Sequence, residues 1–384
     1  MKILFINHTS QLSGADYSLG SLLDNLSNDT TRVMLIRSKS QSKSHFIGKC
    51  KLETTTVMSI FMTTPRTPPY GFFLLSYHIA KLPLALWELR KLVKKHNITH
   101  IHLNESDLLA YAFFGFLLKL PVIIHARGAI AAERNGVSRA VRVLSRCRNV
   151  HLVGIDKESV NSYPKEWIGR SSIVYNPVRL QNVTDKTIAA FRDRYNLHSS
   201  DLIITQVAAL HVEKGVWELL DVFQDVLKNH KRVKLLFVGD DHETHGEGSR
   251  LKEAVSKRGL TDSVVFTGYL HEVAVVYAIT DIVLCMFGKY LRGVGRTAYE
   301  AAIYGKPLVA TIPSAGGTET VIDGKTGLIY DPNDHVGIVQ GINKLLQDTE
   351  YRLQLGKLAK ATIGLRHDPQ AIATQIERIF RSMK

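Results

Sequence analysis

The sequence predicts an α/β protein with two domains, each built around a parallel β-sheet. With 384 residues, the chain is longer than a single hydrophobic core usually supports, so two domains of ordinary size are expected. Short apolar runs alternate with helical patterns throughout, which is typical of parallel strands connected by helices. A polar stretch from Asn176 to Asp185 separates two such series and is a natural linker. We expect domains at residues 1–180 and 181–365, followed by a final helix at 366–384.

The apolar runs give the expected strands in chain order. In the first half they are Lys2–Ile6, Val33–Ile36, Ile98–Leu103, Val122–His125, Val150–Ile155 and Ser172–Tyr175. In the second half they are Leu202–Ala208, Val233–Val238, Val264–Thr267, Ile282–Met286, Leu308–Ala310 and Gly327–Tyr330. Apolar residues recur at intervals of three and four from Val216 to Asn229 and predict a helix there. Asp368 and Pro369 are typical of an N-cap and a first helical residue, so they should open the final helix.

Composition favours a folded protein of a reducing compartment. Hydrophobic residues make up 45% of the chain, which suits a globular protein. The cysteines, Cys50, Cys147 and Cys285, show no metal-binding spacing. The apolar start from Met1 to Asn7 is too short for a signal peptide, and no stretch reaches the roughly 18 to 20 apolar residues of a membrane-spanning helix. We therefore expect a cytoplasmic location.

The positive charge is concentrated in the first half. Residues 1–180 hold 24 Lys and Arg against 11 Asp and Glu, whereas residues 181–384 hold 25 against 24. The halves should therefore meet different partners, and the basic half could face an anionic membrane, a phosphorylated acceptor or nucleic acid. A merely basic surface is an equally open interpretation. Nucleic acid is not expected as a partner, because no helix-turn-helix, zinc-finger or RNA-recognition signature accompanies the charge.

Two segments could carry this charge to a membrane. The aromatic stretch from Gly71 leads through Pro83 into a helix, Leu84–His96, which ends with several lysines and suits an interfacial contact. A helix packed into the core with a solvated end is equally compatible. Arg139, Arg142 and Arg146 recur at helical spacing and predict one basic stripe. This stripe is the better candidate for binding anionic lipid or a lipid diphosphate.

The segment from Gly293 to Gly324 carries the most specific pattern. Gly293 and Gly295 open a short helix that begins with Arg296 and Thr297 and carries Glu300. Helix N-termini leave backbone N–H groups unpaired and attract anions, and glycine lets a phosphate approach the backbone closely. A carboxylate at the position of Glu300 can accept hydrogen bonds from a ribose. The pattern predicts a nucleotide site.

Together with Gly305, Lys306 and Pro307, this segment resembles the nucleotide-sugar site of family-four glycosyltransferases, retaining enzymes of the GT-B fold. The resemblance implies two Rossmann-like domains facing across a cleft, with the C-terminal helix crossing back to the first domain. The first domain would bind the acceptor and the second a UDP- or GDP-linked sugar. No cofactor and no metal ion are implied.

The second half matches the family at the diphosphate and departs from it in two places. Lys214 and Gly215 resemble the end of the family segment Gly-Arg-Leu-x-x-x-Lys-Gly, whose cations neutralise the diphosphate, but Ala209 stands at the arginine position. Glu300 corresponds to the second glutamate of a family pair, and Arg292 stands where the first would contact the transferred sugar. We hypothesise that Arg292 takes over part of the phosphate neutralisation, a role that suits a planar guanidinium.

The first half resembles the family more loosely. Ser13 and Gly14 follow the first strand and resemble a Gly-Gly-Ala-Glu segment whose amides approach the donor phosphate. His125 ends a strand and resembles a histidine beside the donor sugar. Arg127 and Asn104 lie near the same edge and are candidate acceptor contacts. The resemblance gives His125, Lys214 and Glu300 as catalytic residues, and the hypothesis on phosphate neutralisation adds Arg292.

The function implied is metal-independent, retaining hexosyl transfer to a glycan or lipid-linked acceptor in surface polysaccharide or lipopolysaccharide biosynthesis. The enzyme would be cytoplasmic and peripheral on the inner face of the membrane. A non-catalytic or weakly active binding protein of the same fold is the alternative, because of Arg292 and Ala209. A Rossmann oxidoreductase is disfavoured, since neither half opens with Gly-x-Gly-x-x-Gly.

Overall fold

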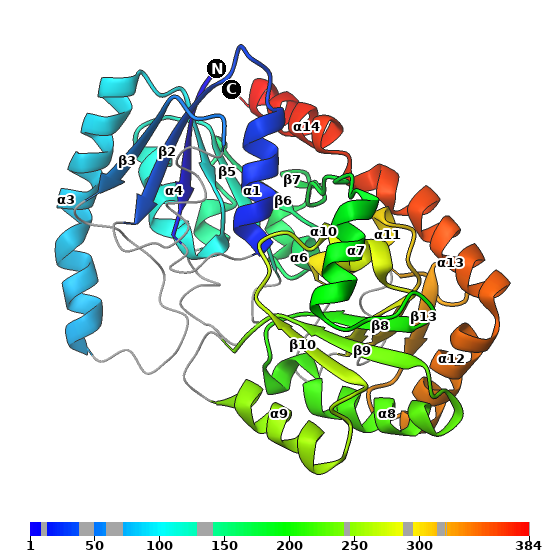
Figure 1. The fold of residues 1–384 in the computed structure, drawn as a ribbon. Coiled ribbons are helices and arrows are strands. Elements are labelled where there is room, and N and C mark those ends of the chain that lie inside the picture. The colour runs from blue at the N-terminus through cyan, green and yellow to red at the C-terminus, as the bar shows by residue number, and fades with distance from the viewer. Residues whose placement is uncertain are drawn as a thin grey trace. The chain divides into compact units, whose positions relative to one another are not determined.

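The computed structural model describes residues 1–8, 14–37, 50–58, 72–128, 141–241, 246–286, 295–312, 319 and 321–383. The described part of the chain forms two compact units (Figure 1). The first unit consists of Met1–Pro177 and His367–Lys384, and the second of Val178–Arg366. Each unit contains a parallel sheet with helices on both faces, so the predicted α/β class is confirmed.

The first unit has a seven-stranded parallel sheet with the order β3-β2-β1-β4-β5-β6-β7. Its strands are β1 Lys2–Asn7, β2 Thr31–Arg37, β3 Thr54–Met58, β4 His100–Leu103, β5 Val122–Ala126, β6 Val150–Gly154 and β7 Ser171–Ile173. Each strand expected for this half is present, and the structure adds β3. Strand β3 was not predicted because it begins with three threonines and so forms no apolar run. Threonine favours strands through its β-branch, and β3 pairs only with β2 at the edge of the sheet, where a fully apolar strand is not required.

Alternate residues of the strands face two separate cores. Leu4 and Ile6 of β1 pack toward helices α3 (Phe72–His96) and α4 (Leu109–Leu117). Ile3 and Phe5 pack toward α1 (Gly14–Asn25) and α14 (Pro369–Ser382). Short helical turns complete the unit: η1 Ser106–Leu108, α6 Lys157–Asn161 and η2 Lys165–Trp167.

Helix α3 differs from its predicted form. Pro83 was expected to precede the helix, but it lies inside one continuous helix. A proline within a helix removes one backbone hydrogen bond. Ala85, Leu89 and Leu92 are buried in the core beyond it, and this packing keeps the helix together across the proline.

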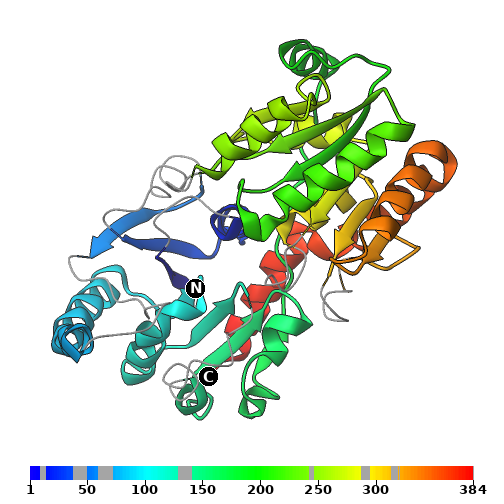
Figure 2. The same cartoon turned by 90° about the horizontal axis from the view of Figure 1, so that it is seen from below.

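Helix α14 ties the end of the chain to its beginning. The predicted cap is confirmed, since Asp368 accepts a hydrogen bond from the backbone N–H of Ala371 at 2.7 Å and Pro369 is the first helical residue. Its apolar residues Ile372, Ile376 and Phe380 share a core with α1, and α14, in red, lies with the strands of the first unit (Figure 2). The expectation that the last helix returns to the first domain is therefore confirmed.

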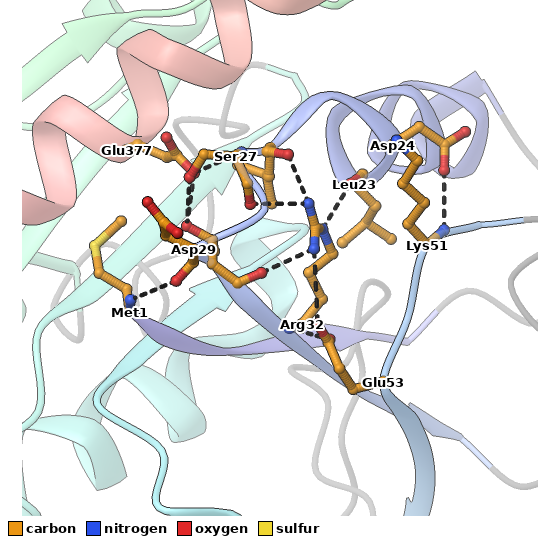
Figure 3. A network of polar contacts seen from close by, with 11 residues as sticks. Met1, Leu23, Asp24, Ser27, Asp29, Arg32, Lys51, Glu53 and Glu377 are labelled. Carbon is orange, nitrogen blue, oxygen red and sulfur yellow. Dashed lines mark hydrogen bonds and ion pairs between the residues drawn. The ribbon is translucent and has the colours of Figure 1, made fainter.

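A polar network fixes the turn between α1 and β2 to this helix (Figure 3). The Glu377 carboxylate accepts hydrogen bonds from the backbone N–H of Ser27 at 2.9 Å and from the hydroxyls of Ser27 and Thr30 at 2.7 and 2.6 Å. Burial raises the pKa of Glu377, but these hydrogen bonds outweigh it and hold the pKa below its usual value. In the same turn, the buried guanidinium of Arg32 donates to the backbone carbonyls of Leu23, Leu26, Ser27 and Thr30. The side chain of Arg32 thus provides hydrogen-bond donors for the backbone carbonyls at and just beyond the end of α1.

The second unit has a six-stranded parallel sheet with the order β10-β9-β8-β11-β12-β13. Its strands are β8 Leu202–Val207, β9 Val233–Val238, β10 Val264–Gly268, β11 Ile282–Met286, β12 Leu308–Thr311 and β13 Gly327–Tyr330, as expected within one residue at each end. Its helices are α7 Asp185–Arg194, α8 Val216–Asn229, α9 Glu247–Lys257, α10 Ala274–Ile279, α11 Arg296–Ile303, α12 His335–Gln347 and α13 Thr349–Thr362, with turns η3 Val212–Lys214 and η4 Gly364–His367. The bounds of α8 are those predicted.

Candidate functional site

The predicted nucleotide-binding residues of the second unit lie at the carboxyl edge of its sheet. Strands β8 and β11 are parallel neighbours, so the segments that follow them leave the sheet on the same side. Lys214 and Gly215 follow β8, and the described start of α11 follows β11. Ligands of open parallel sheets bind at this edge. The fold therefore brings the two sequence motifs, some 80 residues apart in the chain, to one place.

Gly215 fixes the junction between η3 and α8. Its φ of 64° is in the left-handed region, and a Cβ at this position would lie 2.3 Å from the carbonyl oxygen of Met286 at the end of β11. Only glycine fits such a close approach of two backbones. The backbone of Lys214 is held at both ends, by a hydrogen bond from its N–H to the carbonyl of His211 at 2.8 Å and by one from Gln206 Nε2 to its own carbonyl at 2.6 Å.

The side chain of Lys214 is partly dehydrated. Burial lowers the pKa of its ammonium, while the neighbouring groups Cys285 and Glu213 act in the opposite direction. Burial also raises the pKa of the Cys285 thiol to about 12, so Cys285 stays neutral beside the lysine. An ammonium that has lost part of its water gains free energy when an anion replaces that water. The site is electrostatically suited to a phosphate.

Helix α11 begins at a glycine N-cap. Gly295 is its N-cap residue with extended backbone, it makes no side-chain cap, and a Cβ there would meet no described atom within 4 Å. The hydroxyl of Thr297 donates to the carbonyl of Val207 at 2.8 Å, which fixes the start of the helix to the end of β8. Space beside a glycine at a helix N-terminus lets an anion approach the backbone N–H groups.

The carboxylate of Glu300 is held by two hydrogen bonds, and its side chain is 13% exposed. One carboxylate oxygen accepts from Arg296 Nε at 2.7 Å and the other from the hydroxyl of Tyr277 at 2.9 Å. The sequence contains a signal for the first bond, since Arg296 and Glu300 are opposite charges four residues apart. It contains none for Tyr277, because a tyrosine in a short apolar helix is indistinguishable from an ordinary core residue. Tyr277 is a residue of the site that the sequence did not reveal.

In the first unit, the predicted residues Asn104 and Arg127 belong to one polar chain along the carboxyl ends of the strands. Arg127 donates to the side-chain oxygen of Asn104 through Nε at 3.1 Å and through a terminal nitrogen at 2.7 Å, and also donates to the side chain of Asn176 at 2.5 Å. Asn104 donates to Asn7 at 3.0 Å, and Asn7 to the buried Asp16 at 2.7 Å. Asn7 and Asp16 were not predicted. The available signal was a polar residue directly after the first apolar strand.

His125 is buried, although it was expected at a strand tip facing a ligand. Its side chain is 0% exposed, and its Nδ1 lies 3.2 Å from Nε2 of His102. Burial, followed by the charge of Arg127, lowers the pKa of both rings, that of His102 to about 3. The ring of His125 packs against that of His102, which in turn lies beside the rings of Phe5 and Phe380. A role for the neutral imidazole of His125 in the reaction stays a prediction.

The remaining predicted residues divide into described and undescribed ones. Ser13, Arg139, Arg292 and Gly293 lie outside the described residues. Gly14 is the exposed first residue of α1. Arg142 is exposed and pairs with Glu166 at 3.3 Å. Arg146 is also exposed, but it lies in a turn, because the described helical residues end at 144, so it does not continue a helical stripe.

Comparison with solved structures identifies the fold of the chain. The chain is similar over its whole length to the crystal structure of Anabaena Alr3699/HepE in complex with UDP and glucose, with a TM-score of 0.76, 20% identity and 100% of both chains covered. It is also similar to the lipopolysaccharide outer core galactosyltransferase WaaB, with a TM-score of 0.68 and 14% identity over 100% of this chain and 99% of that one. The protein has the GT-B fold of glycosyltransferases.

A family model matches the chain within the second unit. Residues 187–362, which make up most of the second unit, match the family model described as "Glycosyl transferases group 1", in agreement with the resemblance found in the sequence motifs. Among curated relatives, N-acetyl-alpha-D-glucosaminyl L-malate synthase of Bacillus anthracis is 25% identical over 54% of this chain and 52% of its own. Alpha-D-kanosaminyltransferase of Streptomyces kanamyceticus is 23% identical over 66% of this chain and 63% of its own. The matches span about half to two thirds of these relatives' length.

Proposed function

We propose that the protein is a retaining glycosyltransferase that moves a hexose from a nucleotide sugar to a glycan or lipid-linked acceptor in surface polysaccharide or lipopolysaccharide biosynthesis. The observation that carries the proposal is the convergence of Lys214, the glycine-capped start of α11 and the fixed carboxylate of Glu300 at one sheet edge. A cation, a helix N-terminus and a carboxylate are what a diphosphate and its ribose require. A structural neighbour in complex with UDP and glucose favours UDP over GDP as the nucleotide.

Each group has a distinct part in the proposed reaction. Lys214 and the first amides of α11 stabilise the negative charge that develops on the departing diphosphate, so the protein's own groups take the place of a metal ion. Glu300 accepts hydrogen bonds from the ribose hydroxyls and sets the register of the donor. Arg127 and Asn104 of the first unit offer polar contacts to the acceptor. Arg292, outside the described residues, supplies the cation that Ala209 lacks.

The proposal is tested by offering the purified chain a panel of UDP- and GDP-sugars and measuring donor hydrolysis and transfer, with and without EDTA. We expect hydrolysis of at least one UDP-sugar that EDTA does not abolish, and products in which NMR shows the anomeric configuration of the donor. Inverted products or full loss of activity in EDTA would contradict the mechanism. Tight nucleotide binding without turnover would favour the non-catalytic alternative.

The first unit has a surface suited to the interface of an anionic membrane. Large apolar side chains are exposed on α3 and α4, two helices that cover the same face of the sheet: Leu84, Trp87, Phe113, Phe116 and Leu117, at 41–53% exposure. The ammonium of Lys91 lies 4.0 Å from the ring centre of Trp87. Exposed aromatics beside lysines suit the headgroup region, where rings enter the interface and cations meet lipid phosphate. None of the described helices is long and apolar enough to cross a bilayer.

We expect the protein to cosediment with vesicles containing phosphatidylglycerol and to bind pure phosphatidylcholine vesicles much less. Replacing both Trp87 and Phe116 by alanine should lower binding at moderate salt by about tenfold, because two buried rings are lost from the interface. Leu353→Ala, which removes a leucine 64% exposed on α13 of the second unit, is the matched control. Unchanged vesicle binding by the double variant would show that Trp87 and Phe116 do not form a membrane-binding surface. A gel shift with duplex DNA at the same salt would indicate that the basic residues bind nucleic acid instead.

A further inference from the structure

We propose that Tyr277 is a positioning residue whose hydroxyl holds the carboxylate of Glu300 for the ribose, and that it thereby sets the discrimination between ribose and 2′-deoxyribose nucleotides. This inference rests on the proposed nucleotide site. It adds a residue that lies outside the sequence motifs and touches the site only through Glu300.

The two bonds to Glu300 come from different directions. Arg296 belongs to the same helix and is 22% exposed, whereas Tyr277 belongs to α10 and is fully buried. Each partner takes one carboxylate oxygen, so rotation of the carboxylate would break both bonds. A carboxylate oxygen has two lone-pair positions and can accept a further hydrogen bond. The vicinal hydroxyls of a ribose can therefore donate to both oxygens while the two protein bonds stay in place.

Tyr277 is itself rigidly held. Its ring stacks on that of Tyr304, with centroids 5.4 Å apart and an interplanar angle of 14°. The hydroxyl of Tyr304 accepts from the backbone N–H of Gln181 at 3.0 Å and donates to the carbonyl of the same residue at 3.1 Å. Burial and the adjacent Glu300 charge raise the pKa of Tyr277 well above its usual value, so its hydroxyl remains a donor at physiological pH.

Removal of this hydroxyl leaves one oxygen of Glu300 without its buried partner. Among the described residues, the partly exposed Arg296 then holds the carboxylate alone, and the carboxylate can rotate about its last side-chain torsion. The strength of a hydrogen bond between a hydroxyl and a charged carboxylate depends strongly on its geometry. The contact to the 2′-hydroxyl should weaken, whereas contacts of the diphosphate with Lys214 and the start of α11 should not change. The effect should therefore be specific to the sugar of the nucleotide.

The experiment is calorimetric titration of the full-length chain with UDP, GDP and their 2′-deoxy forms. Wild type should bind the ribonucleotide at least about tenfold more tightly than the deoxy form. Tyr277→Phe should weaken ribonucleotide binding by about tenfold and deoxynucleotide binding by less than about threefold, so the discrimination ratio falls. Tyr304→Phe keeps the ring stack and removes the other hydroxyl, and it should keep the wild-type ratio. Thermal unfolding of each variant checks that it is folded.

The outcomes separate this inference from the proposed function. If wild type binds neither UDP nor GDP, the nucleotide site itself is wrong, and the role of Tyr277 falls with it. If wild type binds but Tyr277→Phe keeps the wild-type ratio, or loses affinity equally for both forms, the tyrosine is only structural and the proposed function stands. A fall of the ratio in Tyr277→Phe alone supports the proposal.

Discussion

Replacement of Lys214 by alanine is expected to lower kcat for sugar transfer by about 10²–10³-fold, the usual loss when one group that stabilises developing charge is removed. The lysine is held at the carboxyl edge of the sheet by two hydrogen bonds of its own backbone, one to the carbonyl of His211 and one from the side chain of Gln206. Its ammonium is partly dehydrated. In the proposed reaction, its interaction with the diphosphate strengthens as the glycosidic bond breaks and negative charge accumulates. The loss should therefore appear mainly in kcat rather than in KM.

The measurement is steady-state kinetics with the donor found by the nucleotide-sugar panel. Lys228→Ala is the control, because Lys228 lies on α8, pairs with Asp225 at 2.6 Å and is 73% exposed. Its removal should leave kcat within about twofold, as for a surface ion pair of little energetic worth. If the Lys214→Ala variant keeps the wild-type kcat, Lys214 is not a catalytic residue. Other cations would then neutralise the charge of the diphosphate.

Replacement of Gly215 by alanine is expected to destabilise the second unit by about 3 kcal/mol or more, because left-handed backbone strain and a steric clash add. The new Cβ would lie 2.3 Å from the carbonyl oxygen of Met286, so the start of α8 or the end of β11 must move. The same movement displaces Lys214, and donor affinity should fall with stability. Urea unfolding and nucleotide titration measure the two effects.

Gly246 provides a matched control for this substitution. It is also the N-cap residue of a helix, α9, and its φ of 63° is close to that of Gly215, but a Cβ there would meet no described atom within 4 Å. Gly246→Ala should therefore cost only the backbone strain, about 1 kcal/mol. Equal losses for the two variants would show that the carbonyl of Met286 moves aside freely and that the close approach does not constrain the site.

The strands and the motif helices could be read from the chain because their signals are local. The apolar runs gave the strands of both sheets, and the apolar periodicity gave the bounds of α8. The prediction missed β3, whose threonines make no apolar run, and placed Pro83 outside a helix that in fact contains it. The two errors have different origins, because the threonines of β3 favour a strand without making an apolar run, whereas the packing of α3 outweighs the local effect of its proline.

The sequence motifs named Lys214, Gly215 and Glu300 as candidate site residues, but they did not name the side chains that hold these residues in place. Lys214, Gly215 and Glu300 stand in recognisable patterns along the chain. Tyr277 and Asn7 stand in no pattern, and His125 lies in an apolar strand whose pattern does not show where the strand ends relative to the sheet edge. Strand β5 extends one residue past His125, whose ring is buried against His102 of the neighbouring strand.

The sequence by itself determined the alternation of strands and helices, the position of each motif at the end of a strand, and the uneven charge of the two halves. Only the tertiary structure decided which side chains meet: Tyr277 with Glu300 across 23 residues, Asn104 with Asn7 across 97 and Glu377 with Ser27 across 350. Caps, turns and periodicity depend on residues close in the chain and can be read there. Contacts between distant residues depend on strand order and register, which arise only when the whole sheet packs.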